Sequence, residues 1–130
     1  MDFVVNPRVK SLHLKGNAWL RDESVQIFAT FFPNLELIDL SSCYYIFGGV
    51  GEVLRRGFNI RHLSLASSSR AKLLEMNFAV PKLEVLNLSR SATDDDALYA
   101  ISMSCCGLLQ LNLENCYDVT EKGVRQVVEK

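Results

Sequence analysis

The length, composition and charge of this chain are those of one ordinary folded domain, and they argue against nucleic acid or an acidic membrane as its partner. The chain has 130 residues, of which 48% are hydrophobic and 22% charged, with a formal net charge of −1. Its 14 basic residues are scattered, so we do not expect it to bind nucleic acid or an acidic membrane. The N-terminus lacks the basic start and apolar stretch of a signal peptide. No apolar run approaches the ~20 residues of a membrane helix, and we expect a cytoplasmic and/or nuclear protein.

The predicted elements follow one motif that occurs five times: an apolar residue, two of any kind, Leu or Ile, any residue, and Leu. The copies are Val9–Leu12–Leu14, Leu35–Ile38–Leu40, Ile60–Leu63–Leu65, Leu83–Leu86–Leu88 and Leu108–Leu111–Leu113, with starts 26, 25, 23 and 25 residues apart. A period of about 20–29 residues built on this motif is typical of leucine-rich repeats, which bury their apolar faces by stacking. We therefore predict a single α/β domain over 1–130, a leucine-rich-repeat solenoid forming a ribonuclease-inhibitor-like horseshoe segment. It would have five repeats, a parallel concave sheet and convex helices.

Each copy of the motif should start with a strand of about five residues and continue into a helix. Alternation along the strand turns Leu12, Leu14 and their equivalents into the core. Three apolar stripes have helical spacing: Val25, Phe28, Ala29 and Phe32; Ala97, Leu98, Ile101 and Cys105; and Val124, Val127 and Val128. The glycines at 48, 49 and 51 should delay the second helix until about Glu52. The short third repeat leaves room for only a turn or two of helix over Ala71–Phe78.

Small polar residues occupy the ninth position of every repeat: Asn17, Cys43, Ser68, Ser91 and Cys116. We expect them to hydrogen-bond the backbone where the chain leaves the strand. Cys43 and Cys116 would be three strands apart, roughly 14 Å, whereas a disulfide requires Cα atoms within about 7 Å, so they cannot pair. Cys105 and Cys106 have no C-x-x-C partner and no nearby His, and we do not expect zinc there.

The residues that alternate with the core leucines should face outward on the concave sheet, where solenoids bind extended partners. The candidate protein-binding residues are Ser11, His13, Lys15, Leu37, Asp39, Ser41, His62, Ser64, Val85, Asn87, Gln110, Asn112 and Glu114. Their mixed polar, charged and apolar character suits a protein or peptide better than a phosphate backbone. The alternative left open is a solvated face that binds nothing in these repeats.

The sequence offers no reason to expect an enzyme, a metal site or a cofactor. His13 and His62 would lie two strands apart, about 10 Å, too far for one zinc ion with bonds of about 2 Å. No Ser or Cys nucleophile is placed near both a base and an orienting acid. Acids at a helix start favour the positive end of the helix dipole, which accounts for Asp94, Asp95 and Asp96 without a metal.

The fifth repeat carries more than the general motif. It reads Cys105-x-x-Leu108-x-x-Leu111-x-Leu113-x-x-Cys116-x-x-Val119-Thr120-Glu121-x-Gly123-Val124. This resembles the cysteine-containing leucine-rich repeat, C-x-x-L-x-x-L-x-L-x-x-C-x-x-I-T-D-x-G-L, and residues 94–98 fill the T-D-x-G-L slot in the fourth repeat. Thr or Asp in the slot caps the helix, and we expect its small residue to let helix and sheet approach closely. The subtype is similar to the repeats of F-box/leucine-rich-repeat proteins, particularly those of plants.

The resemblance implies a recognition module rather than a catalyst. In that family the repeats bind a target protein, while a separate F-box docks the adaptor of an SCF-type ubiquitin ligase, which leads to ubiquitin-dependent degradation. The residues before Val9 leave no room for an F-box, so adaptor and cullin would be reached only through an F-box missing from this chain. The last helix is not followed by a polar closing repeat, and we expect part of a longer array. The alternatives are a general leucine-rich-repeat scaffold or an immune-receptor fragment without a ubiquitin role.

Overall fold

Five short parallel strands form a single sheet whose spatial order is the order of the chain. The computed structural model describes residues 5–56, 59–68 and 78–128. The strands are β1 (Ser11–His13), β2 (Leu37–Asp39), β3 (His62–Ser64), β4 (Val85–Asn87) and β5 (Gln110–Asn112). They pair as β1-β2-β3-β4-β5, all parallel. This α/β arrangement is compatible with a repeat solenoid.

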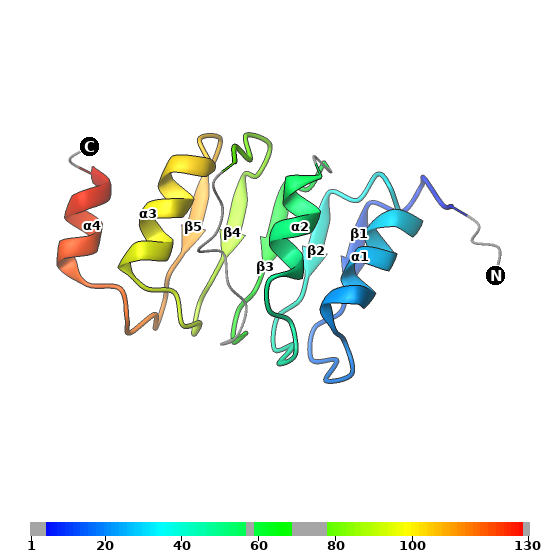
Figure 1. Ribbon diagram of the computed structural model, residues 1–130, viewed down its shortest axis with the longest axis horizontal. Coiled ribbons are helices and arrows are strands. Elements are labelled where there is room, and N and C mark those ends of the chain that lie inside the picture. The colour runs from blue at the N-terminus through cyan, green and yellow to red at the C-terminus, as the bar shows by residue number, and fades with distance from the viewer. Residues whose placement is uncertain (1–4, 57–58, 69–77, 129–130) are drawn as a thin grey trace.

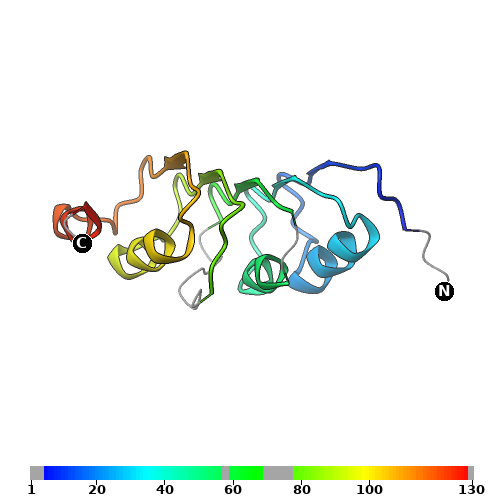
Figure 2. The same ribbon diagram turned by 90° about the horizontal axis from the view of Figure 1, so that it is seen from above.

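The helices of the described ranges are α1 (Asp22–Phe31), α2 (Gly49–Arg55), α3 (Asp95–Ser104) and α4 (Glu121–Val128). In Figure 1 they stand in a row beside the strands. Figure 2, turned by 90°, shows α1, α2 and α3 all on one side of the sheet. The molecule therefore has two layers, and the other face of the sheet, here called the open sheet face, carries no helix from the described part of the chain.

The strands are three residues long rather than the expected five, although their hydrogen-bond ladder continues beyond them. Leu14 N–H donates to the Asp39 carbonyl, and Leu40 N–H donates in the same way to that of Ser64, both at 2.9 Å. Alternation puts the motif leucines into the core as predicted, and the three inner repeats bury them most completely: Ile38, Leu40, Leu63, Leu65, Leu86 and Leu88. Leu12 and Leu111 are only partly buried, because β1 and β5 each have one neighbouring strand.

The helical stripes of α1 and α3 pack as predicted, but that of α4 does not. Val25 and Ala29 are buried, and Leu98 and Ile101 are buried likewise. In α4, by contrast, Val124 and Val128 are exposed, Val128 to 75%. The helix contacts only α3 among the described elements, so most of its apolar side lacks a neighbouring helix or strand in the described part of the chain.

The second helix begins earlier than the glycines predicted, at Gly49 instead of about Glu52. A Cβ on Gly49 would lie 2.6 Å from the Cβ of Asp22 at the start of α1. The absence of a side chain therefore lets α2 approach α1, and this packing outweighs the weak helix propensity of glycine. The helix expected over Ala71–Phe78 lies outside the described residues except for Phe78, which packs against the core.

Every repeat turns away from its strand in the same way. The eighth position has a left-handed backbone in all five copies, with φ between 56° and 79°: Gly16, Ser42, Ser67, Arg90 and Asn115. At the ninth position, Cys43 donates to the carbonyl of Leu14 at 3.2 Å, and Ser68 donates to that of Leu40 at 3.0 Å. These bonds confirm the predicted role of the ninth residue, and together with the bond from Cys116 to the Leu88 carbonyl they tie three of the turns to the preceding repeat.

Candidate functional site

The pairing register arranges the outward-facing residues of the open sheet face in rows. Strand partners align position by position, so that each row collects one repeat position from all five strands. The third-position row is Ser11, Leu37, His62, Val85 and Gln110, and the fifth-position row is His13, Asp39, Ser64, Asn87 and Asn112. Backbone bonds just past the strands align the seventh-position row, Lys15, Ser41, Ala66, Ser89 and Glu114.

The fifth-position row is engaged in intramolecular hydrogen bonds that the sequence analysis missed. In four repeats its side-chain oxygen accepts a bond from the backbone N–H two residues later: Asp39 from Ser41 at 3.0 Å, Ser64 from Ala66 at 3.5 Å, Asn87 from Ser89 at 3.0 Å and Asn112 from Glu114 at 2.9 Å. These bonds close the turn at the end of each strand. The row is therefore structural as well as outward-facing.

The same bonds determine which atoms Asn87 and Asn112 offer to a ligand. Since a backbone N–H donates to the amide oxygen, the amide NH2 is the group left for other contacts. The two asparagines are direct partners on β4 and β5, so this end of the sheet presents a pair of neighbouring donors. Carbonyl oxygens of an extended polypeptide would be their natural acceptors.

The other two rows combine apolar, polar and charged groups. Leu37 and Val85 are half-buried, and the exposed ring of His62 lies on the strand between them. Ser41 is buried, and its hydroxyl lies 2.6 Å from that of Ser64, so it is not available to a partner. The exposed Lys15 and Glu114 stand at opposite ends of the seventh-position row.

The two histidines of the open sheet face do not lie together. His13 and His62 are on different strands and in different rows. In the described ranges, no group of three or more His, Cys, Asp or Glu residues could hold a metal ion. A cleft of about 330 Å³ on the outer side of α1 is mainly apolar and is lined by Val5, Glu23, Gln26, Ile27, Thr30, Phe31 and Arg56.

The four cysteines are free thiols in different environments. Cys43, Cys105 and Cys116 are buried, whereas Cys106 is exposed. Burial raises the pKa of Cys105 to about 11, with a smaller contribution from the neighbouring Cys106. Burial also raises the pKa of Cys43, although the backbone N–H groups of Asn17 and Gly16 act in the opposite direction. The raised pKa values make Cys43 and Cys105 poor nucleophiles. The thiols of Cys43 and Cys116 donate hydrogen bonds to backbone carbonyls.

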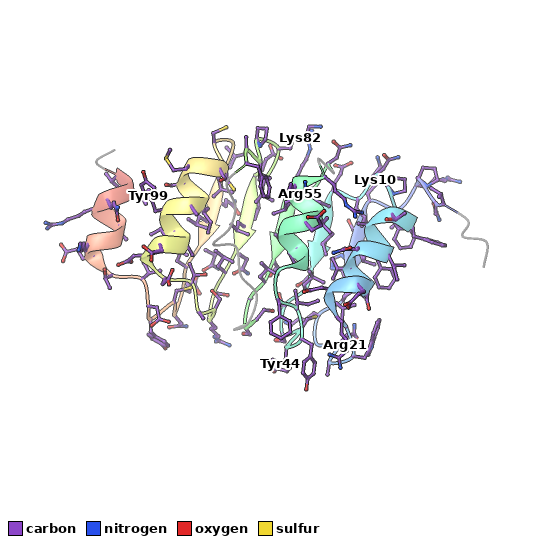
Figure 3. The ribbon with its side chains drawn as sticks, in the orientation of Figure 1. Lys10, Arg21, Tyr44, Arg55, Lys82 and Tyr99 are labelled. Carbon is purple, nitrogen blue, oxygen red and sulfur yellow. The ribbon has the colours of Figure 1, made fainter. Side chains whose placement is uncertain are left out.

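Sequence reasoning also missed a group of exposed aromatic side chains beside the open sheet face. Trp19 lies in the loop after β1, and Tyr44, Tyr45 and Phe47 lie in the loop after β2. The Arg21 guanidinium carbon is 4.8 Å from the centroid of the Tyr45 ring. Figure 3 places Arg21 and Tyr44 at the same edge of the molecule, away from Lys10 and Lys82. The missed signal was the run of aromatic residues directly after the ninth position, where a solvated loop would carry polar ones.

No family model matches this chain. Within the described residues, no helix combines the length and the apolar character needed to cross a lipid bilayer.

Proposed function

We propose that the chain is a leucine-rich-repeat recognition region of the F-box type, which binds a target protein across its open sheet face. The observation that carries this proposal is the exact repetition of one unit. Strand positions align in a single register, and the eighth position is left-handed in all five repeats. A unit of this kind, stacked through its neighbours, is the basis of solenoid proteins that bind partners along an extended sheet.

The cysteine positions support the narrower assignment to the cysteine-containing subtype. The Sγ of Cys116 donates to the Leu88 carbonyl at 2.9 Å, and Cys43 makes the corresponding bond to Leu14. Both thiols are buried, so the Cys of the motif has a structural reason rather than a catalytic one. This subtype links the chain to F-box/leucine-rich-repeat proteins and thereby to an SCF-type ubiquitin ligase.

The groups on the open sheet face suggest how a target would be held. Asn87 and Asn112 offer amide donors to the main chain of an extended segment, and Leu37 and Val85 offer apolar contact one row away. Non-obligate protein interfaces are about as apolar as the rest of a protein surface, so a mixture of polar and apolar groups is compatible with such an interface. Recognition would rest on complementarity, and no bond-making step is required of the chain.

The test is proximity labelling in plant cells with a biotin ligase fused to this chain, followed by identification of the labelled proteins. Labelling of a true target should be lost with Val85→Lys, which puts a charge on β4 of the open sheet face. It should be retained with Ile27→Lys, a matched change of an exposed apolar residue on the outer side of α1. Equal labelling by both variants would contradict binding at the sheet.

The ubiquitin role needs a separate measurement. If the chain belongs to a ligase receptor, the target whose labelling is abolished by Val85→Lys should accumulate in cells when the activation of cullin ligases by neddylation is blocked. A target whose lifetime does not respond would leave the sheet as a binding surface and remove the ligase from the proposal. The chain would then be a general leucine-rich-repeat scaffold.

A further inference from the structure

The loops after β1 and β2 expose more aromatic surface than any other part of the described chain. Among the described residues, six aromatic side chains are exposed: Trp19, Tyr44, Tyr45, Phe47, Tyr99 and Tyr117. The first four lie within these two loops, where Trp19 is 58% and Tyr44 54% exposed. Contiguous exposed apolar groups on a folded domain mark sites of interaction, and Trp, Tyr and Arg are the residues most enriched among those that dominate binding energy.

The two loops are held together at three points, so the aromatic groups form one fixed surface. Gly16 N–H donates to the Ser41 carbonyl at 2.8 Å, and Cys43 Sγ donates to that of Leu14 at 3.2 Å. Further along, the backbone N–H of Phe47 donates to Oδ1 of Asp22 at 2.9 Å. A surface ordered before binding loses little conformational entropy when a partner docks.

Two basic side chains, Arg21 and Lys15, lie at this edge beside the acid Asp22. The Arg21 guanidinium lies over the Tyr45 ring, a cation–π contact that favours this position of the side chain. Neither Arg21 nor the exposed Lys15 forms an ion pair with another described residue. The neighbouring carboxylate of Asp22 keeps its negative charge, but it accepts the Phe47 N–H and forms no ion pair with Arg21. The group that complements this edge is a carboxylate beside an apolar side chain.

We propose that Trp19, Arg21, Tyr44, Tyr45 and Phe47, here called the aromatic loop edge, bind a short acidic segment of a partner protein. Bulky apolar side chains of the segment pack on the aromatic rings, and an adjacent Asp or Glu pairs with Arg21. An anionic membrane fits less well, because lipid-binding clusters contain about 4–8 basic residues and this edge has two. The surface is separate from the open sheet face, and the inference does not depend on the function proposed above.

The experiment is selection of a phage-displayed random dodecapeptide library on the full wild-type chain, with a Trp19→Ala/Tyr44→Ala double variant as counter-selection. Peptides that bind only the wild type should carry Asp or Glu next to a large apolar residue. Measured by fluorescence anisotropy, their affinity should fall at least tenfold in the double variant and severalfold in Arg21→Gln. It should also weaken as salt is raised, because the ion pair is exposed.

Matched controls separate this site from others. Tyr99→Ala/Tyr117→Ala removes two exposed aromatic rings elsewhere and should leave peptide affinity unchanged, as should Val85→Lys on the open sheet face. Unchanged far-UV circular dichroism and melting temperature establish that the double variant is folded.

Failure to enrich peptides, enrichment without acidic residues, or equal binding to the double variant would overturn the proposal. A wild-type chain that is dimeric by sedimentation, with a monomeric double variant, would assign the edge to a second copy instead. Binding of the wild type, but not of the double variant, to vesicles of phosphatidylcholine and phosphatidylserine would assign it to a membrane. Either result would also overturn the peptide proposal.

Discussion

Asp95, in the first turn of α3, receives two hydrogen bonds from Thr120, which stands 25 residues later, just before α4. The backbone N–H of Thr120 donates to Oδ1 at 2.8 Å, and its hydroxyl donates to Oδ2 at 2.5 Å. The equivalent acid at the start of α1, Asp22, receives the N–H of Phe47 ahead of α2. An acid at the start of one helix thus fixes the loop that leads into the next helix.

The bonds from Thr120 predict a pH-dependent contribution to stability. The Thr120 hydroxyl, and to a lesser extent its N–H, lower the pKa of Asp95. A carboxyl group whose pKa is lower in the folded than in the unfolded protein stabilises the folded state. This stabilisation is fully present at pH values above the unfolded pKa of about 3.9. It is lost as the pH falls through the lower pKa of the folded state. Asp95→Asn should therefore be less stable than the wild type near neutral pH, with the difference shrinking below about pH 4. Urea unfolding at several pH values measures it.

The control for that prediction is Asp96→Asn, which removes an exposed acid from the same turn. Its stability difference from the wild type should depend less on pH than that of Asp95→Asn, because the bonds from Thr120 go to Asp95. A second variant, Thr120→Val, removes the hydroxyl donor and should reduce the pH dependence without abolishing it, because the backbone N–H remains. A pH dependence identical in Asp95→Asn and the wild type would contradict this account.

Two glycines inside helices should respond in opposite directions to alanine. A Cβ on Gly123 in α4 would lie 2.0 Å from Oδ1 of Asp95, whereas nothing lies within 4 Å of a Cβ on Gly51 in α2. Gly51→Ala should stabilise the protein by up to about 1 kcal/mol through helix propensity. Gly123→Ala should destabilise it by about 1–3 kcal/mol, because the Asp95 side chain must move away from Thr120. Stabilisation by both substitutions, measured by denaturant unfolding, would contradict the close contact.

The same contact shows why one expectation from the sequence was wrong. The small residue of the T-D-x-G slot was expected to bring helix and sheet together, but Gly123 packs on an acid of the preceding helix. A repeat pattern predicts which residues face inward, since that depends only on alternation along the chain. The repeat pattern does not predict how far one helix is shifted relative to the next, and this shift decides which atoms each glycine contacts.

Because alternation along the chain decides which residues face inward, the strand positions and the ninth-position donors could be predicted from the sequence. The left-handed backbone at the eighth position could not. Gly16 and Asn115 are usual left-handed residues, but Ser42, Ser67 and Arg90 occupy the same conformation and carry no sequence signal for it. The bonds of the fifth-position row were missed because outward-facing Asp, Ser and Asn look like solvated groups.

The left-handed turn yields a third prediction. Arg90 has φ of 56°, which costs a residue with a Cβ about 1–2 kcal/mol, so Arg90→Gly should stabilise the protein by about 1 kcal/mol in spite of the greater freedom of glycine in the unfolded chain. Ala92→Gly, two residues later and exposed, has no such conformation to relieve and should be neutral or destabilising. If both glycines changed the midpoint of unfolding alike, backbone strain at Arg90 would not be the cause.

The thiols predict a simple labelling pattern. With iodoacetamide at mildly alkaline pH, the exposed Cys106 should react first. Cys43 and Cys105 are buried and have raised pKa values, so little thiolate is present to react. Mass spectrometry of the native protein should show one fast modification, and the unfolded protein should take up four. Rapid labelling of Cys105 in the native protein would mean that its helix end opens readily.

Ser68 tests whether the ninth position needs a donor rather than a particular residue. Its hydroxyl is buried and donates to the Leu40 carbonyl at 3.0 Å, where Cys43 and Cys116 use a thiol in other repeats. Ser68→Ala should cost about 1 kcal/mol of unfolding free energy through loss of that bond. Ser68→Cys keeps a donor and should cost less, while Ser89→Ala, on the open sheet face, should stay within about 0.5 kcal/mol of the wild type. The comparison is decisive because alanine and cysteine differ at this site mainly by the donor. If the two substitutions at Ser68 were equally destabilising, the shape of the serine side chain, and not its hydrogen bond, would explain why small polar residues recur at this turn.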